Sequence, residues 1–245
     1  MNKPIYRYLA DRKWRSYQRK VLMQRIEQMT VVPDVLPAVN PTVSTALSFG
    51  KRKVQHGDFI ESHISESAPA LRIQTYEKGE KLVTIAVVNA DVPNVEKDGF
   101  DYRCHFLASN IRINPTQGHV NFGRLDESQV VLPWHPAYAQ KGAPYQRLSI
   151  FVLEQPEGEG GEPTELPVAQ IKEKGRYTER HGFVLRSFVD KHRLKPIGVD
   201  LFRTQWDEGT AGVMQRAGIA GWDVEFKRKR IEPLPYKKLP GSRYR

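Results

Sequence analysis

The first thirty residues follow a helical pattern of apolar and basic positions. Apolar side chains recur every three or four residues from Trp14 to Met29, and basic side chains fill most positions between them. This pattern is typical of a membrane-surface helix, a mitochondrial targeting helix, or an arm that packs on its own domain or a partner while its cations meet phosphate. Mitochondrial targeting helices are rich in serine and poor in acidic residues. Residues 1–30 contain Asp11, Glu27 and only one serine, which argues against a targeting helix. We favour the arm.

A proline-containing segment follows this helix. Residues 31–41 hold Pro33, Pro37 and Pro41, which disfavour a regular helix and favour an extended linker. We therefore expect residues 1–45 to form an appendage outside the core, residues 46–225 to form the folded domain, and residues 226–245 to form a basic tail.

The domain is dominated by patterns typical of strands. Residues 71–75 alternate apolar and polar side chains, and residues 81–90 are rich in β-branched side chains, as in a strand buried on both faces. Further strands are predicted at 105–113, 118–122, 129–133 and 147–155. An acidic loop at 157–167 precedes helical spacing at 183–194 and 209–218. The predicted fold class is α+β and β-rich, with short late helices and basic extensions at both ends.

Composition limits the class of protein. The chain has 245 residues, of which 39% are hydrophobic, which is enough for a substantial core. Cys104 is the only cysteine, so the sequence excludes an internal disulfide and favours a reducing compartment. No apolar run approaches the roughly 18 to 20 residues of a membrane-spanning helix.

The formal net charge of +10 is concentrated at the two ends. Residues 1–30 hold eight basic and two acidic side chains, residues 226–245 hold eight and one, and the rest of the chain is slightly acidic. Such ends suit a polyanionic partner, although solvated, disordered ends have the same composition. The candidate contacts are Arg7, Arg12, Lys13, Arg15, Arg19, Lys20, Arg25, Lys227, Arg228, Lys229, Arg230, Lys237, Lys238, Arg243 and Arg245.

No pattern in the sequence supports catalysis. Cys104 and His105 are neighbours on a predicted strand, so their side chains point to opposite faces and cannot share a proton. Ser149 lies outside a nucleophile elbow, the histidines lack metal-ligand spacing, and no glycine-rich phosphate loop occurs. We expect no enzyme activity, no catalytic residues, no cofactor and no metal.

Four segments in order resemble the phosphatidylethanolamine-binding protein family. They are NADVPN (89–94), CHFLASNI (104–111), KGAPYQR with the apolar strand after it (141–153), and FVLRSFVDKHRLKPIGVDLFRTQWDE (183–208). The family's patterns are D-P-D-x-P, a strand with a histidine pair, G-x-x-x-H-R, and a late R-x-F helix followed by a strand that ends near W-D. The resemblance covers about residues 45–210 and implies the family's β-sheet domain.

The resemblance also implies a small pocket for phosphate-like anions and lipid headgroups, here in altered form. Asp91, Pro93, His105, Gly142 and Arg147 match the family's pattern. Asn89, Ala90, Cys104 and Gln146 depart from it, with Gln146 in place of the histidine of the turn. An amide cannot become cationic, so an anion loses a charge-assisted hydrogen bond, a loss of about 1.5 to 3 kcal/mol. We therefore expect the remnant of a ligand pocket, which no longer suits a small anion but still has room for a water or a different small ligand. Its residues are Asn89, Asp91, His105, Gln146 and Arg147.

The arm carries a second resemblance. The segment from Trp14 to Pro37, placed before such a domain, is similar to the mitochondrial large-subunit ribosomal proteins that contain a phosphatidylethanolamine-binding-like domain. This resemblance implies a non-catalytic, structural role in the mitochondrial matrix, with ribosomal RNA and neighbouring large-subunit proteins as partners of the basic ends. The alternative is a free module that binds anions or phospholipid headgroups.

Overall fold

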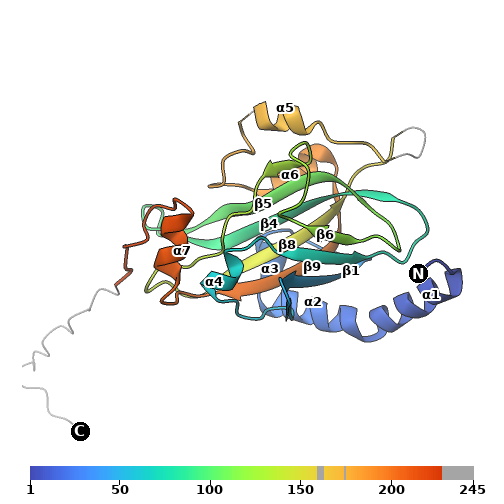
Figure 1. Ribbon diagram of the computed structural model, residues 1–245, viewed down its shortest axis with the longest axis horizontal. Coiled ribbons are helices and arrows are strands. Elements are labelled where there is room, and N and C mark those ends of the chain that lie inside the picture. The colour runs from blue at the N-terminus through green and yellow to red at the C-terminus, as the bar shows by residue number, and fades with distance from the viewer. Residues whose placement is uncertain (159–162, 174, 228–245) are drawn as a thin grey trace, which may run out of the picture.

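Two antiparallel β-sheets packed face to face form the centre of the molecule (Figure 1). The computed structural model describes residues 1–158, 163–173 and 175–227. The smaller sheet has the strand order β2-β1-β3-β6, and the larger has the order β7-β5-β4-β8-β9. The strands are β1 (Ser44–Phe49), β2 (Arg52–Val54), β3 (Ala70–Gln74), β4 (Lys81–Asn94), β5 (Gly99–Ile113), β6 (His119–Asn121), β7 (Val130–Leu132), β8 (Gln146–Glu154) and β9 (Lys195–Thr204).

The larger sheet is buried on both faces because its central strands are apolar on both sides. In β4, Val83, Ile85 and Val87 face the core between the sheets, whereas Ala86 and Val88 face a second core on the opposite side. This alternation follows the two-residue period of a strand. The prediction that residues 81–90 form a strand buried on both faces is confirmed.

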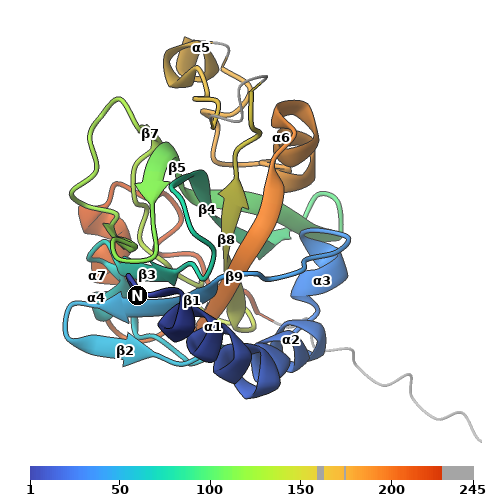
Figure 2. The same ribbon diagram turned by 90° about the vertical axis from the view of Figure 1, so that its right-hand side faces the viewer.

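Helices cover the outer core and one end of the sheets (Figure 2). They are α1 (Pro4–Lys13), a π-helical turn η1 (Trp14–Gln18), α2 (Arg19–Gln28), α3 (Val31–Asp34), α4 (Ser62–Ser65), α5 (Val168–Glu173), α6 (Leu185–His192) and α7 (Thr210–Arg216). Together α1, η1 and α2 form one continuous helical arm, residues 4–28, that runs along the edge of the body (Figures 1 and 2).

The predicted β-rich α+β class and all six predicted strands are confirmed, as are the late helices at α6 and α7. Strand β9 appears where the family resemblance implied one. The sequence patterns missed the hairpin of β1 and β2 and the short helices α4 and α5. Strand β1 begins at Ser44, so it crosses the expected boundary between linker and domain.

The expectation that residues 1–45 lie outside the core is wrong for the second half of this segment. Leu22, Ile26, Val31 and Leu36 are almost fully buried and belong to the outer core of the larger sheet. The physical reason is that this sheet face is apolar and needs a cover, which α2 and the linker provide. Only α1 has no buried residue. The linker begins with α3, which is a single helical turn, and it is extended after α3.

None of the helices in the described part of the chain has the length and apolar character needed to cross a membrane.

Candidate functional site

Asn89 and Gln146 lie side by side on the paired strands β4 and β8 and satisfy each other. The Nδ2 group of Asn89 donates to Oε1 of Gln146 at 2.6 Å, and Oδ1 of Asn89 accepts from the backbone N–H of Asp91 at 2.9 Å. Both side chains are buried. Two amides thus form an internal hydrogen bond at the positions where the family pattern has an aspartate and a histidine.

Asp91 and Arg147 form an ion pair that also binds the arm. Arg147 donates through Nε and its backbone N–H to Oδ2 of Asp91, each at 2.8 Å, and through Nη2 to Oδ1 at 2.5 Å. Its Nη1 group donates to the carbonyl oxygen of Met29, to the hydroxyl of Thr30 and to Asp34. The hydrogen bonds to Asp91, and then those to Asp34, raise the pKa of Arg147. Arg147 therefore connects Asp91 and the start of β8 to the C-terminal end of α2.

His105 makes no hydrogen bond to these four residues. Its Nδ1 atom lies 3.0 Å from the carbonyl oxygen of His135, and its Nε2 atom is buried with no hydrogen-bond partner among the described residues. Burial, together with the nearby His135, lowers the pKa of His105 well below 6.5. His105 is therefore neutral and donates its Nδ1 proton. The structure thus brings together Asn89, Gln146, Asp91 and Arg147, whereas His105 belongs to another cluster.

Two arginines in the His105 cluster were missed by sequence reasoning. The guanidinium of Arg103 lies 5.0 Å from the ring of Tyr138, and its Nη2 lies 3.0 Å from Nε2 of His181. Arg180 donates to the carbonyl oxygens of Cys104, His105 and Pro133. Burial, followed by the charge of Arg180, lowers the pKa of Arg103 to about 10. Arg103 could have been found from the sequence, because the two-residue period of a strand places it on the same face as His105. Arg180 and His181 could not, because only tertiary contacts bring them to this cluster.

The Cys104 thiol is unsuited to nucleophilic chemistry. Cys104 is fully buried in the outer core, and its Sγ lies 3.3 Å from the carbonyl oxygen of Phe106. Burial raises the pKa of the thiol to about 12. His105 contacts His135 and Tyr138 instead. The prediction that Cys104 and His105 do not act as a pair agrees with this geometry.

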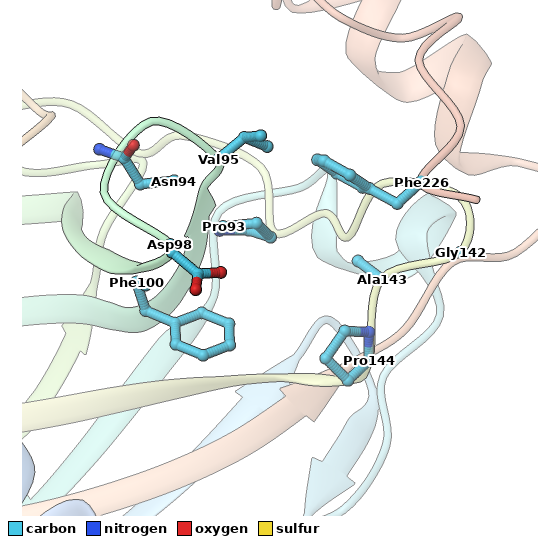
Figure 3. Close-up of a pocket in the computed structure, with 10 residues that line it drawn as sticks. Pro93, Asn94, Val95, Asp98, Phe100, Gly142, Ala143, Pro144 and Phe226 are labelled. Atoms are coloured by element: carbon cyan, nitrogen blue, oxygen red, sulfur yellow. The ribbon is translucent and has the colours of Figure 1, made fainter. Parts of the chain in front are cut away.

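An apolar pocket of about 330 Å³ opens beside the former ligand turn (Figure 3). Pro93 and Phe100 line one side, and Pro144 and Phe226 line the other. The backbone N–H of Phe226 donates to the carbonyl oxygen of Lys141 at 2.8 Å. Gly142 has φ +82°, and a Cβ there would lie 2.0 Å from the carbonyl oxygen of Phe226. The glycine of the motif thus permits the close approach of the segment that leads into the tail.

The predicted basic contacts of the arm divide into two groups. Arg15 pairs with Asp11 at 2.7 Å, Arg19 binds Asn40 and the carbonyl oxygen of Pro41, and Arg7 donates to backbone carbonyls near the start of the chain. The second group is exposed and makes no side-chain hydrogen bond or ion pair within the described residues. It comprises Arg12, Lys13, Lys20 and Arg25.

In the tail, Lys227 lies 3.6 Å from Glu225. The other predicted contacts of the tail lie outside the described residues, namely Arg228, Lys229, Arg230, Lys237, Lys238, Arg243 and Arg245.

Comparison with known proteins identifies the domain. The model of the phosphatidylethanolamine-binding protein family matches residues 50–195, more than half of the chain. The chain belongs to the phosphatidylethanolamine-binding protein family. A phosphatidylethanolamine-binding protein from Plasmodium vivax superposes with a TM-score of 0.56 at 16% identity, covering 75% of this chain and 97% of that one. A carboxypeptidase Y inhibitor, solved with its cognate proteinase, gives 0.54 at 12% identity and covers 77% and 96%. These two structures share the fold.

One relative matches beyond the family domain. Large ribosomal subunit protein mL38 of Schizosaccharomyces pombe is 24% identical over 236 residues, which cover 95% of this chain and 71% of that protein. The phosphatidylethanolamine-binding domain occupies 50–195. A match of this length therefore includes most of the chain outside the domain.

Proposed function

We propose that this protein is a structural component of the mitochondrial large ribosomal subunit, where its basic extensions bind ribosomal RNA and neighbouring proteins around a non-catalytic scaffold. The observation that carries the proposal is the match to large ribosomal subunit protein mL38 over 95% of the chain. Because this match reaches well beyond residues 50–195, it includes the arm as well as the family domain.

The state of the former ligand pocket supports a scaffold. Asn89 and Gln146 hydrogen-bond to each other, and Arg147 is occupied by Asp91 and by the arm. A small anion in this remnant would have to displace these bonds, and Gln146 offers it no positive charge. The alternative of a free module for anions or phospholipid headgroups is therefore less well supported.

The distribution of charge supports an RNA partner. Lys13 and Lys20 are exposed on the arm and have no ion-pair partner within the described residues. Cations of this kind bind phosphates independently of sequence and release counterions, so the affinity falls as salt rises. Further basic residues follow from Lys227 onward at the other end of the chain, where Lys227 itself lies 3.6 Å from Glu225.

The test is sedimentation of the full-length protein with mitochondrial large ribosomal subunits at moderate salt, combined with a salt titration of RNA binding. We expect co-sedimentation. We expect Lys13→Gln/Lys20→Gln to make the dependence of log K on log salt less steep, with a slope smaller in magnitude by about 1.5, or 0.7 to 0.9 per lost phosphate contact. Removing the whole arm is a poor test, because its second half belongs to the core.

The matched control is Lys78→Gln/Lys195→Gln, which removes the same charge from exposed positions outside the arm. It should leave the slope unchanged. A wild-type protein that stays free of the subunit, or an arm variant whose salt dependence equals that of the control, would contradict the proposal.

A further inference from the structure

A groove of about 610 Å³ separates the helical arm from the body. Tyr17, Val21 and Arg25 line it from the arm, and His56 and Arg203 line it from the loop after β2 and from β9. We call it the arm groove. None of Asn89, Asp91, His105, Gln146 and Arg147 lines it, although Arg203 pairs with Arg147 across β8 and β9.

The arm groove contains arginines with free hydrogen-bond donors. The Arg25 side chain is exposed and makes no hydrogen bond or ion pair within residues 1–158, 163–173 and 175–227. Arg203 donates through Nε to the carbonyl oxygen of Gly57 at 2.7 Å, and within the same residues its terminal nitrogens have no hydrogen-bond acceptor. The carboxylate that lines the groove, Asp58, accepts from the backbone N–H of Gln55 at 2.9 Å. Arg25 and Arg203 therefore supply free cationic donors to a groove that also contains one carboxylate.

Tyr17 is the aromatic ring among the groove's lining residues, and the exposed rings of Phe59 and Tyr145 lie outside this lining, beside Arg203. Tyr17 is 71% exposed although it lies in the apolar series of the arm, and it belongs to the π-helical turn η1. At the far end, the guanidinium of Arg203 lies 3.9 Å from the ring of Phe59 and 5.2 Å from that of Tyr145. Both rings are partly exposed and meet edge to face.

Flat rings interleaved with unpaired guanidinium groups fit a ligand with π-faces and a polyanionic backbone. Bases stack on such rings whatever their identity, and arginines bind the phosphates between them. A duplex keeps its base faces covered by stacking, so it cannot use the rings. We propose that the arm groove binds an unpaired stretch of RNA, with phosphates on Arg25 and Arg203 and a base on Tyr17. This proposal rests on the proposed ribosomal function and names the form of RNA that this surface takes.

The test compares two fluorescently labelled probes by anisotropy with the full-length protein. One is a twelve-nucleotide oligouridylate, and the other is a fully paired RNA hairpin that has the same number of phosphates and is closed by a non-nucleotide linker, so that it offers no unpaired base. We expect Tyr17→Ala to weaken binding of the oligouridylate about tenfold with an unchanged salt slope, because a stacking contact is lost. Arg25→Gln should weaken it and also lower the slope by about 0.7. Hairpin binding should change less than twofold in the Tyr17→Ala variant.

Tyr8→Ala is the matched control, since Tyr8 is a similarly exposed tyrosine (61%) on the arm but does not line the groove. The proposal is overturned if Tyr17→Ala binds the oligouridylate like the wild type, if Tyr8→Ala weakens it equally, or if the hairpin loses as much affinity. Co-sedimentation with the large subunit is measured on the same variants. A protein that still co-sediments but fails the oligouridylate test keeps the proposed function and shows that the groove holds something else, such as a neighbouring protein.

Discussion

Arg147 occupies the position of the arginine in the family pattern, and in this protein it makes structural contacts there. In the resemblance it marks the ligand turn. In this structure it holds Asp91 with a forked set of hydrogen bonds and reaches across to the carbonyl oxygen of Met29 and to Thr30. Both members of the Asp91 pair are about 15% exposed. A guanidinium suits this position because its donors are fixed in one plane and can serve two partners at once.

We expect Arg147→Lys to lower the free energy of unfolding by about 2 kcal/mol, because an ammonium keeps the charge but cannot hold both Asp91 and the arm. Urea unfolding of the purified protein measures the change. Arg112→Lys is the control, since Arg112 is exposed and pairs with Glu165 at 3.3 Å, and such pairs contribute less than about 1 kcal/mol. Equal losses in the two variants would show that Arg147 does not connect turn and arm.

At the scale of elements, the arm consists of two parts with different roles. Helix α2 and the linker close the outer core of the larger sheet through Leu22, Ile26 and Val31. Helix α1 extends the same helix beyond the body and exposes Ile5, Tyr8 and Leu9 (Figure 1). One half of the arm is therefore structural, and the other is free for contact with partners.

The two halves can be separated with the same substitution. Ile26→Ala should destabilise the protein by about 2 to 5 kcal/mol, because it removes buried methyl groups and leaves a cavity. Ile5→Ala, at a side chain that is 56% exposed, should change the stability by less than about 0.5 kcal/mol. Thermal and urea unfolding give both values. An arm that only rests on the surface would make the two effects equally small.

At the scale of the whole molecule, buried histidines link stability to pH. Burial lowers the pKa of His105, and burial with the charges of Arg180 and Arg103 lowers that of His135 to about 4. His56 differs: burial opposes its protonation, but its hydrogen bond to Asp200, at 2.8 Å, together with the charges of Asp200 and Asp58, outweighs burial and raises its pKa. Protonated His56 therefore stabilises the fold below pH 6.5, whereas His105 and His135 make the fold less stable as the pH falls below 6.5.

We expect the free energy of unfolding to fall as the pH drops from about 6.5 toward 4. In this range His105 and His135 become protonated in the unfolded chain but stay neutral in the folded protein, because folding lowers their pKa. The loss attributable to His135 between pH 7 and pH 5 should be on the order of 1 kcal/mol. His135→Gln should remove that part of the pH dependence in urea unfolding. His119→Gln, which removes an imidazole from an exposed position, is the control. A His135→Gln variant that keeps the full pH dependence would contradict this assignment.

Periodicity found the strands and late helices because each depends on a local alternation of apolar and polar side chains. It missed β1 and β2, whose short segments at 44–49 and 52–54 alternate too briefly to stand out. The motifs named Asn89 and Gln146 together, and the structure places them in contact; that they are the remnant of a ligand pocket stays a prediction. The separation of His105 from them was not, because the cluster around it is completed by residues 75 or more positions away, such as Arg180.

By itself the sequence determined the fold class, the family and the charged ends, since each depends on residue types and their spacing. Only the tertiary structure decided that half of the arm is core, that Arg147 binds it to the former ligand turn, and that Tyr17, Arg25 and Arg203 share one groove. The physical reason is that burial and pairing depend on which surfaces meet. Segments far apart along the chain come together only when the apolar outer face of the larger sheet is covered.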